Sequence, residues 1–165
     1  MQRYCQALLF AAGSALAFAA GNASAVVTVT FTQPEGYVDM PFAPWDKEQV
    51  MKDLRAHFEK LGAQLPAGQD LKVEVLDIDL AGQMEPIARA GREIRVLKGR
   101  ADWPAMKLRY SVEAEGRVLK SGETRVTDMA YLNHTTSNRY ATNEPLRYEK
   151  VMLDDWFKKV MKAQQ

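Results

Sequence analysis

The chain has 165 residues, of which 47% are hydrophobic and 26% charged, and its formal net charge at pH 7 is +1. This composition is typical of a single soluble globular domain, and it excludes a disordered chain, a collagen-like chain and a disulfide-rich scaffold. The near-zero charge also argues against nucleic acid as the main partner, because phosphate binding requires an excess of basic residues.

Residues 1–25 have the pattern of a secretory signal peptide. A short basic stretch precedes an apolar run over residues 7–20, and small residues close the segment at Ala25. The run is shorter than the roughly 20 apolar residues that a membrane-spanning helix needs. We therefore expect cleavage after Ala25, export to the periplasm, no stable membrane anchor and one mature domain over residues 26–165. The single cysteine, Cys5, would be lost on cleavage, so the mature domain would form no disulfide bond.

The spacing of hydrophobic residues along the chain predicts the first two elements. Residues 27–32 alternate apolar side chains with threonine, which predicts a strand with one buried face. Residues 46–62 carry apolar side chains at helical spacing, which predicts an amphipathic helix. We expect Asp46 to cap its N-terminus, Gly62 to end it and His57 to lie on its solvent side.

Residues 71–80 predict a strand whose alternation changes phase midway. The apolar residues of its first half and those of its second half have opposite parity. This change predicts a β-bulge near Val75–Leu76. The bulge would place Asp77 and Asp79 together on the side opposite the buried face, where they avoid the cost of burying charge.

The second half of the chain predicts four more regular elements, three strands and one helix. Residues 81–104 are basic and rich in glycine and proline, which predicts a long loop with a short strand over residues 93–98. Alternation predicts a strand over residues 106–113, and the tight turn at Glu115-Gly116 predicts a second strand over residues 117–128. A final amphipathic helix is expected to be capped by Asn143. The order of elements predicts an α+β fold, a two-layer sandwich in which two helices cover one face of a mostly antiparallel sheet of about four strands.

The sequence holds no complete catalytic motif, and we favour a protein without enzymatic activity. A nucleophile elbow, a phosphate-binding glycine loop and a zinc-protease helix are all absent. His134 could act as a general base on Thr135 or Ser137 with Asp128 as the orienting carboxylate. Chance composition of a polar loop explains the same residues more simply.

Asp77 and Asp79 form the best candidate metal site. Two carboxylates two residues apart in a strand lie about 6–7 Å apart on one face. They could hold a divalent cation such as calcium or magnesium if other ligands came from elsewhere. The alternative is that they bind loop amides or nearby arginines. A rival functional hypothesis, a carboxylate- or metal-dependent hydrolase, requires Asp77, Asp79 and Asp102 to converge around a shared metal or water.

The leading hypothesis is a binding or envelope-accessory protein that uses its basic segment together with the Asp77 and Asp79 edge. Residues 86–109 hold seven basic and two acidic residues, and long loops in compact domains often carry function. The partner would be an envelope component or another protein. The candidate binding residues are Arg92, Arg95, Arg100, Asp102 and Trp103. A simpler alternative is that the basic segment neutralises the acidic one before it, while Trp103 closes the core and Asp102 fixes a turn.

Several motifs resemble one family in order along the chain. They are Leu65-Pro-Ala-Gly-Gln69, Asp77-Ile-Asp-Leu-Ala-Gly82, Arg95-Val-Leu-Lys-Gly-Arg-Ala-Asp-Trp-Pro104, Asp128-Met-Ala-Tyr-Leu132, Leu146-Arg-Tyr-Glu-Lys150 and Leu153-Asp-Asp-Trp-Phe157. Together they resemble the exported bacterial family called domain of unknown function 3016, over nearly all of the mature chain. The resemblance implies an exported protein of comparable length, with no assigned activity and no catalytic residues to transfer.

Overall fold

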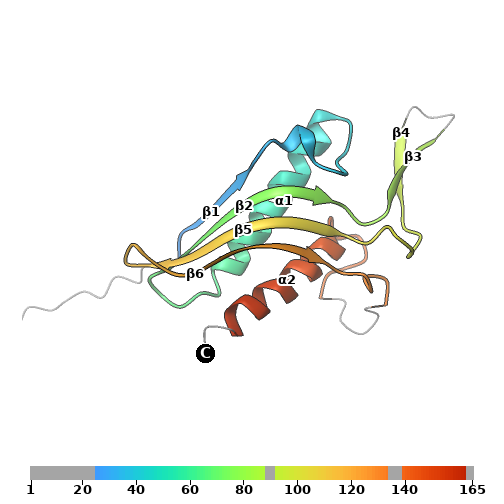
Figure 1. Cartoon of the computed structure of the whole chain (residues 1–165). Helices are drawn as coiled ribbons and strands as arrows, with labels where there is room; N and C mark the ends of the chain where they lie inside the picture. The colour runs from blue at the N-terminus through green and yellow to red at the C-terminus, as the bar shows by residue number, and fades with distance from the viewer. Residues whose placement is uncertain (1–24, 88–91, 134–138, 163–165) are drawn as a thin grey trace, which may run out of the picture.

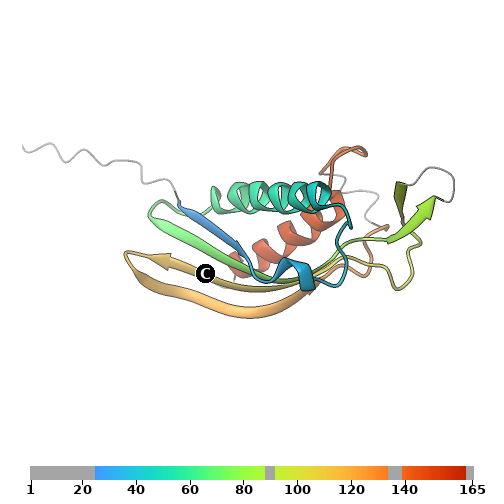
Figure 2. The same cartoon turned by 90° about the horizontal axis from the view of Figure 1, so that it is seen from above.

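The computed structural model describes residues 25–87, 92–133 and 139–162. It shows a four-stranded sheet with two helices on one of its faces and a separate two-stranded hairpin (Figures 1 and 2). The elements are β1 (Val27–Phe31), the short 3-10 helix η1 (Pro34–Gly36), α1 (Pro44–Gly62), β2 (Gln69–Asp79), β3 (Gln83–Ile87), β4 (Arg92–Val96), β5 (Ala105–Ala114), β6 (Arg117–Thr127) and α2 (Arg147–Lys162). The predicted α+β class is confirmed.

The sheet has the strand order β1-β2-β5-β6. Strands β1 and β2 run parallel, and α1 makes the crossover between them. The pairings of β2 with β5 and of β5 with β6 are antiparallel. The sheet is therefore mostly antiparallel, and its two edges are β1 and β6.

The hydrophobic core lies between the sheet and the two helices. Trp156 of α2 stands edge-on to Phe58 of α1 and to Tyr110 of β5, with ring centroids 6.2 and 5.4 Å apart. Other core side chains include Leu54, Leu61, Leu71, Val73, Val75, Ile78, Met106, Leu108, Val112, Leu153 and Phe157. Each fully buried Leu or Phe contributes about 1.5–3 kcal/mol to folding. Of the helices described, neither is long and apolar enough to cross a membrane.

The predicted β-bulge in β2 is confirmed. The register against β5 shifts between Val75 and Asp77. Ile78 is fully buried, whereas Asp77 and Asp79 on either side of it are partly exposed. The two carboxylates therefore share the face of β2 that points away from the helices, as the change of parity predicted.

The predicted end of α1 at Gly62 is confirmed, but its start differs from the prediction. The helix begins at Pro44, where no N–H is needed, and Ala43 gives no side-chain cap. Asp46 lies inside the first turn, where its charge favours the positive end of the helix dipole. Gly62 is the last helical residue, and a Cβ there would lie 2.1 Å from Cγ2 of Val27. Glycine is required because β1 passes close to the helix, not because the chain turns.

The final helix, in contrast, begins later than predicted. It starts at Arg147, so Asn143 does not cap it. The N–H of Lys150 donates to the carbonyl of Leu146 at 2.9 Å, and Leu146 itself has a positive φ of 54°. A backbone turn at Leu146 therefore starts α2 in place of the polar cap that the sequence predicted.

The segment predicted as a long loop contains a hairpin, which we call the β3–β4 arm. The short strand predicted over residues 93–98 corresponds to β4, but its partner β3 was missed. Pro86 lies within β3, although proline argues against a strand in the sequence. A two-stranded ribbon accommodates it because, over the described residues, the outer edge of each strand pairs with no other strand. The arm leaves the end of β2 and projects away from the body of the molecule (Figure 1).

Candidate functional site

Arg95 of β4 fixes the base of the β3–β4 arm. Its Nη1 lies 2.5 Å from Oδ2 of Asp39 and also donates to the backbone carbonyls of Ala81 at 3.2 Å and Gly82 at 3.3 Å. The contact to the Asp39 carboxylate is a charge-assisted hydrogen bond, whereas the carbonyls, with that of Leu80 at 3.5 Å, share the donor at longer distances. Arg95, predicted to bind a partner, is thus engaged within the chain.

A buried carboxylate supports the same junction from the helix side. Oε1 of Glu149, in the first turn of α2, accepts the N–H of Ala81 at 2.8 Å. Burial raises the pKa of Glu149, while the hydrogen bond from Ala81 and the charge of Arg95 oppose that rise. Glu149 and Arg95 also line a pocket of about 360 Å³ between the arm and α2. The two chain ends of the arm are therefore held by both the sheet and the helix layer.

Gly82 allows the two strands of the arm to meet where they leave the body. Its φ is +83°, a conformation that favours glycine, and a Cβ would lie 2.6 Å from the carbonyl oxygen of Val96. Its N–H donates to the carbonyl of Asp102 at 2.8 Å. A side chain at this position would push β4 away from the end of β2.

Asp102 organises the turn that follows the arm. Its carboxylate accepts the N–H of Lys98 at 2.6 Å and that of Arg100 at 2.8 Å. Burial alone would raise the pKa of Asp102, but these backbone N–H groups and the hydroxyl of Tyr131 hold it below its ordinary value. Trp103 beside it is half-buried. The geometry matches the simpler interpretation of this pair, in which Asp102 fixes the turn.

The structure describes the side chain of only one of the other two arginines predicted to bind a partner, Arg92 and Arg100. Arg100 is exposed in the turn after the arm. Arg92 begins β4, and its side chain lies outside the described part of the chain. His134, Thr135 and Ser137, the alternative catalytic group, also lie outside the described residues.

Asp77 and Asp79 have different surroundings although they share a face. Oδ1 of Asp77 accepts the N–H of Val38 at 3.0 Å. Asp79 faces Arg125 at 3.8 Å, and its pKa is raised by burial and then by the nearby charge of Asp39. Asp102 does not join them: over the described residues, no group of three or more His, Cys, Asp or Glu side chains could hold a metal ion.

The comparison with protein families covers most of the chain. The model of one family, described as "Protein of unknown function (DUF3016)", matches residues 25–159. The chain belongs to this DUF3016 family. No curated protein and no solved structure matches it.

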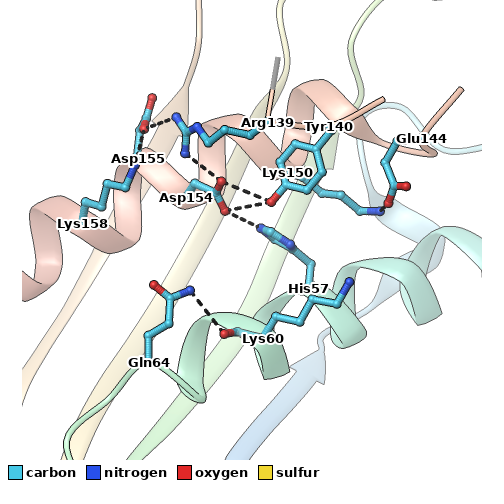
Figure 3. A network of polar contacts seen from close by, with 10 residues as sticks. All are labelled: His57, Lys60, Gln64, Arg139, Tyr140, Glu144, Lys150, Asp154, Asp155 and Lys158. Carbon is cyan, nitrogen blue, oxygen red and sulfur yellow. Dashed lines mark hydrogen bonds and ion pairs between the residues drawn. The ribbon is translucent and has the colours of Figure 1, made fainter. Parts of the chain in front are cut away.

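In this DUF3016 chain, the sequence prediction for His57 is wrong. His57 is only 3% exposed, and its Nε2 lies 3.1 Å from Oδ1 of Asp154 on α2 (Figure 3). The Tyr140 hydroxyl donates to Asp154 at 3.1 Å, and Arg139 bridges Asp154 at 2.7 Å and Asp155 at 2.6 Å. The signal was present in the sequence, because His57 lies three residues after buried Leu54 and therefore on the apolar face of α1.

The His57 network joins both helices to the segment before α2. Burial would raise the pKa of Asp154, but His57, Tyr140 and Arg139 together hold it below its ordinary value. The ionised carboxylate is therefore the stable form and acts as the common acceptor. These contacts join α1 and α2 to the segment before α2 and so fix the position of the two helices relative to each other.

Proposed function

We propose that this chain is an exported, non-enzymatic binding or envelope-accessory module that contacts an envelope component or protein partner through the β3–β4 arm. The observation that carries the proposal is the rigid attachment of a projecting hairpin. Arg95 and Asp39 clamp its base, and Gly82 and Asp102 bring its two ends together. Fixing the base of the hairpin sets the direction in which β3 and β4 leave the body, which lowers the entropic cost of binding.

The side chains along the arm support a mixed apolar and basic contact. Ile94 is 47% exposed and Leu97 is 39% exposed. Lys98 and Arg100 follow them and are also exposed. Lys98 pairs with Glu85 across the arm at 2.6 Å, and both side chains reach solvent, so this pair is weak. Exposed aliphatic side chains beside cations suit a partner surface with an apolar centre and acidic groups around it.

The carboxylates at the end of β2 contribute to the position of this surface. Asp77 holds Val38, and Asp79 lies at the last position of β2, from which the arm departs. We propose that they support the arm's direction, with Asp79 contributing negative charge to the edge of the contact.

Export is the second part of the proposal, and it rests on the pattern of residues 1–25. The test is the mass of the chain recovered from the periplasmic fraction of bacteria that produce it. We expect a product that begins at Val26. A full-length chain retained in the cytoplasm would contradict this part.

Binding is tested by immobilising the purified chain over residues 26–165 and passing detergent-solubilised envelope over it. The arm variant carries Ile94→Asp and Leu97→Asp. The matched control carries Val118→Asp and Leu119→Asp, which change two apolar residues of somewhat greater exposure at the start of β6. We expect the same retained component with the wild type and the control, and its loss with the arm variant. Equal retention by all three would overturn the proposal.

A further inference from the structure

β6 is an edge strand of the sheet. It is 11 residues long, and over the described residues no strand pairs with its outer side. Edge strands present unpaired N–H and C=O groups, on which a further strand can pair. The opposite edge, β1, has only five residues. β6 is therefore the longer of the two edges on which another chain could extend the sheet.

The side chains of β6 alternate between the two faces of the sheet. Glu123 pairs with Arg109 of β5 at 2.9 Å, and Arg125, two residues further on, lies on the same face, away from the helices. Lys120 has the opposite parity, and its Nζ donates to a carbonyl of α2 at 2.9 Å. Thr124 shares the parity of Lys120 and so lies on the face that the helices cover.

The order of residues around Thr124 is self-complementary. Two antiparallel copies of one strand are related by a two-fold axis, which keeps every residue on its own face of the sheet. With the axis at Thr124, Glu123 of each copy lies opposite Arg125 of the other. Opposite charges placed directly across two strands stabilise the pair by about 0.2–1 kcal/mol, and like charges destabilise it. An axis at Glu123 or at Arg125 places like charges opposite each other, so the charges select the register centred on Thr124.

Both members of this charge pair are accessible on the outer face. The side chain of Arg125 is 56% exposed, and its ion pair with Asp79 is long, at 3.8 Å. Lys107 at 2.8 Å and Arg109 at 2.9 Å hold the Glu123 carboxylate in place. An exposed ion pair contributes little by itself. In such a dimer the charges would set the register, while the backbone of β6 would make the contact.

α2 crosses behind the sheet from the end of β2 to the edge at β6 (Figure 1). Glu149 in its first turn accepts the N–H of Ala81, which lies just past β2. Lys120, in the first half of β6, binds the carbonyl of Val160 near the other end of α2. The helix therefore lies close to β6 along the first half of the strand and moves away from the edge along the second half.

A groove opens beside the second half of β6. It has a volume of about 480 Å³ and lies between residues Thr124–Thr127 and α2. The two-fold axis exchanges the halves of β6, so the last turn of α2 from the second copy would lie at this groove. That turn carries Lys159 and Lys162, whereas the groove holds the carboxylates of Asp128 and Asp155. The two helices would meet in space that the fold leaves open, with opposite charges facing each other.

We propose that the chain forms a symmetric dimer in which β6 pairs antiparallel with β6 of a second copy, centred on Thr124. The two sheets then form one continuous sheet. The β3–β4 arm leaves from the end of β2, where Asp79 lies in one row with Ala105 and Thr127. The dimer therefore carries its two arms at opposite ends, where each can contact a partner.

Analytical ultracentrifugation of the chain over residues 26–165 tests the dimer. We expect reversible dimerisation below about 100 μM. Arg125→Glu places like charges opposite each other at both pairs and should weaken the dimer by about tenfold or more. The matched control, Arg117→Glu, makes the same charge change at the other end of β6 and should alter the dissociation constant less than about twofold. A monomer at every concentration, or equal weakening by both variants, would overturn the proposal.

Single cysteines test the register, because residues 26–165 contain no cysteine. Thr124→Cys places two cysteines directly opposite each other, within the roughly 4.4–6.8 Å between Cα atoms that a disulfide requires. We expect this variant to form a cross-linked dimer on mild oxidation. Ser121→Cys, on the same strand, keeps its two copies six residues apart, or about 20 Å, and should not cross-link. Equal cross-linking of both variants, or none with Thr124→Cys, would show that the register is wrong.

Amide hydrogen exchange identifies the edge that pairs. Exchange in β6 should slow as the concentration rises and the dimer forms, while exchange in β1 should stay the same. Slower exchange in β1 with no change in β6 would contradict the proposal. The arm variant with Ile94→Asp and Leu97→Asp should dimerise like the wild type, so failure of the dimer is distinguishable from failure of the arm proposal.

Discussion

Arg95 and Asp39 lie 56 residues apart in the chain, yet Nη1 of Arg95 is 2.5 Å from Oδ2 of Asp39. The contact joins β4 to the segment that follows η1, and that segment is itself bridged to the end of β2 through Asp39 and Asp79. One ion pair thus connects the projecting arm to the edge of the sheet. This makes Arg95 a residue that positions the arm and leaves the contact surface to its neighbours.

Replacing Arg95 should loosen the arm without exposing the core. Arg95→Leu leaves Asp39 and three carbonyl oxygens without their donor, so we expect a loss of about 1–3 kcal/mol in the free energy of unfolding. Hydrogen exchange should become faster in β3 and β4. Arg100→Leu, which removes an exposed arginine nearby, is the control and should change little. Equal effects of both substitutions would contradict the role of Arg95.

Gly62 should tolerate no side chain while Val27 faces it. The Cβ of alanine would come within 2.1 Å of Val27, so Gly62→Ala should destabilise the chain by about 1–3 kcal/mol. Gly36→Ala adds the same methyl group in open space and serves as the control. Adding Val27→Ala to Gly62→Ala should recover part of the loss, measured by urea unfolding in a double-mutant cycle. No recovery would show that the close approach of β1 is not the cause.

Asp154 should matter more to stability than its neighbour Asp155. Asp154→Ala removes the common acceptor of His57, Tyr140 and Arg139, which predicts a loss of about 1–3 kcal/mol. Asp155→Ala removes a more exposed partner of Arg139 and should cost less than about 1 kcal/mol. The comparison requires only equilibrium unfolding of the two variants. A larger loss of stability for Asp155→Ala than for Asp154→Ala would contradict the role of Asp154 as the main acceptor of the network.

The buried Glu149 predicts an unusual pH dependence of the free energy of unfolding. Burial raises its pKa above the ordinary 4.5, so the folded state favours the protonated acid. Its contribution to stability is therefore present below about pH 4.5 and is lost as the pH rises through the folded-state pKa. Glu149→Gln keeps an acceptor for Ala81 and removes the charge. We expect the variant to be more stable than the wild type at pH 7 and to lose that advantage near pH 4.

The control for the pH series is Glu59→Gln, which changes an exposed glutamate on α1. Its unfolding free energy should follow the wild type at every pH. If Glu149→Gln also follows the wild type from pH 4 to pH 7, the carboxylate does not destabilise the fold when it ionises.

Local patterns predicted much of the fold. The parity change in β2 located the bulge between Val75 and Asp77, because one inserted residue reverses every later side chain. The strand before the turn at Glu115-Gly116 followed from simple alternation, and the turn itself predicted the strand after it. The β3 strand was missed because Pro86 interrupts it, and proline is acceptable there only because the hairpin stands alone.

The candidate site is built from contacts between residues that lie far apart in the chain, and local sequence patterns do not predict such contacts. Nothing near Arg95 indicates that its partner is Asp39, or that Glu149 accepts the N–H of Ala81 from 68 residues away. His57 is different, since its spacing from Leu54 already placed it on the buried face of α1. Its partner Asp154 lies on α2, far away in sequence, so the contact that stabilises a buried histidine does not follow from local spacing.

The arm is the central feature of this account, and site-specific photo-cross-linking tests it most directly. A photoreactive amino acid is placed at Leu97, directly after β4 at the base of the arm, in bacteria that produce the chain, and at Val118 near the start of β6 as a control of greater exposure. If the arm contacts a partner, we expect a discrete cross-linked product from position 97 that is absent from position 118. No product from position 97, or the same product from both positions, would contradict it.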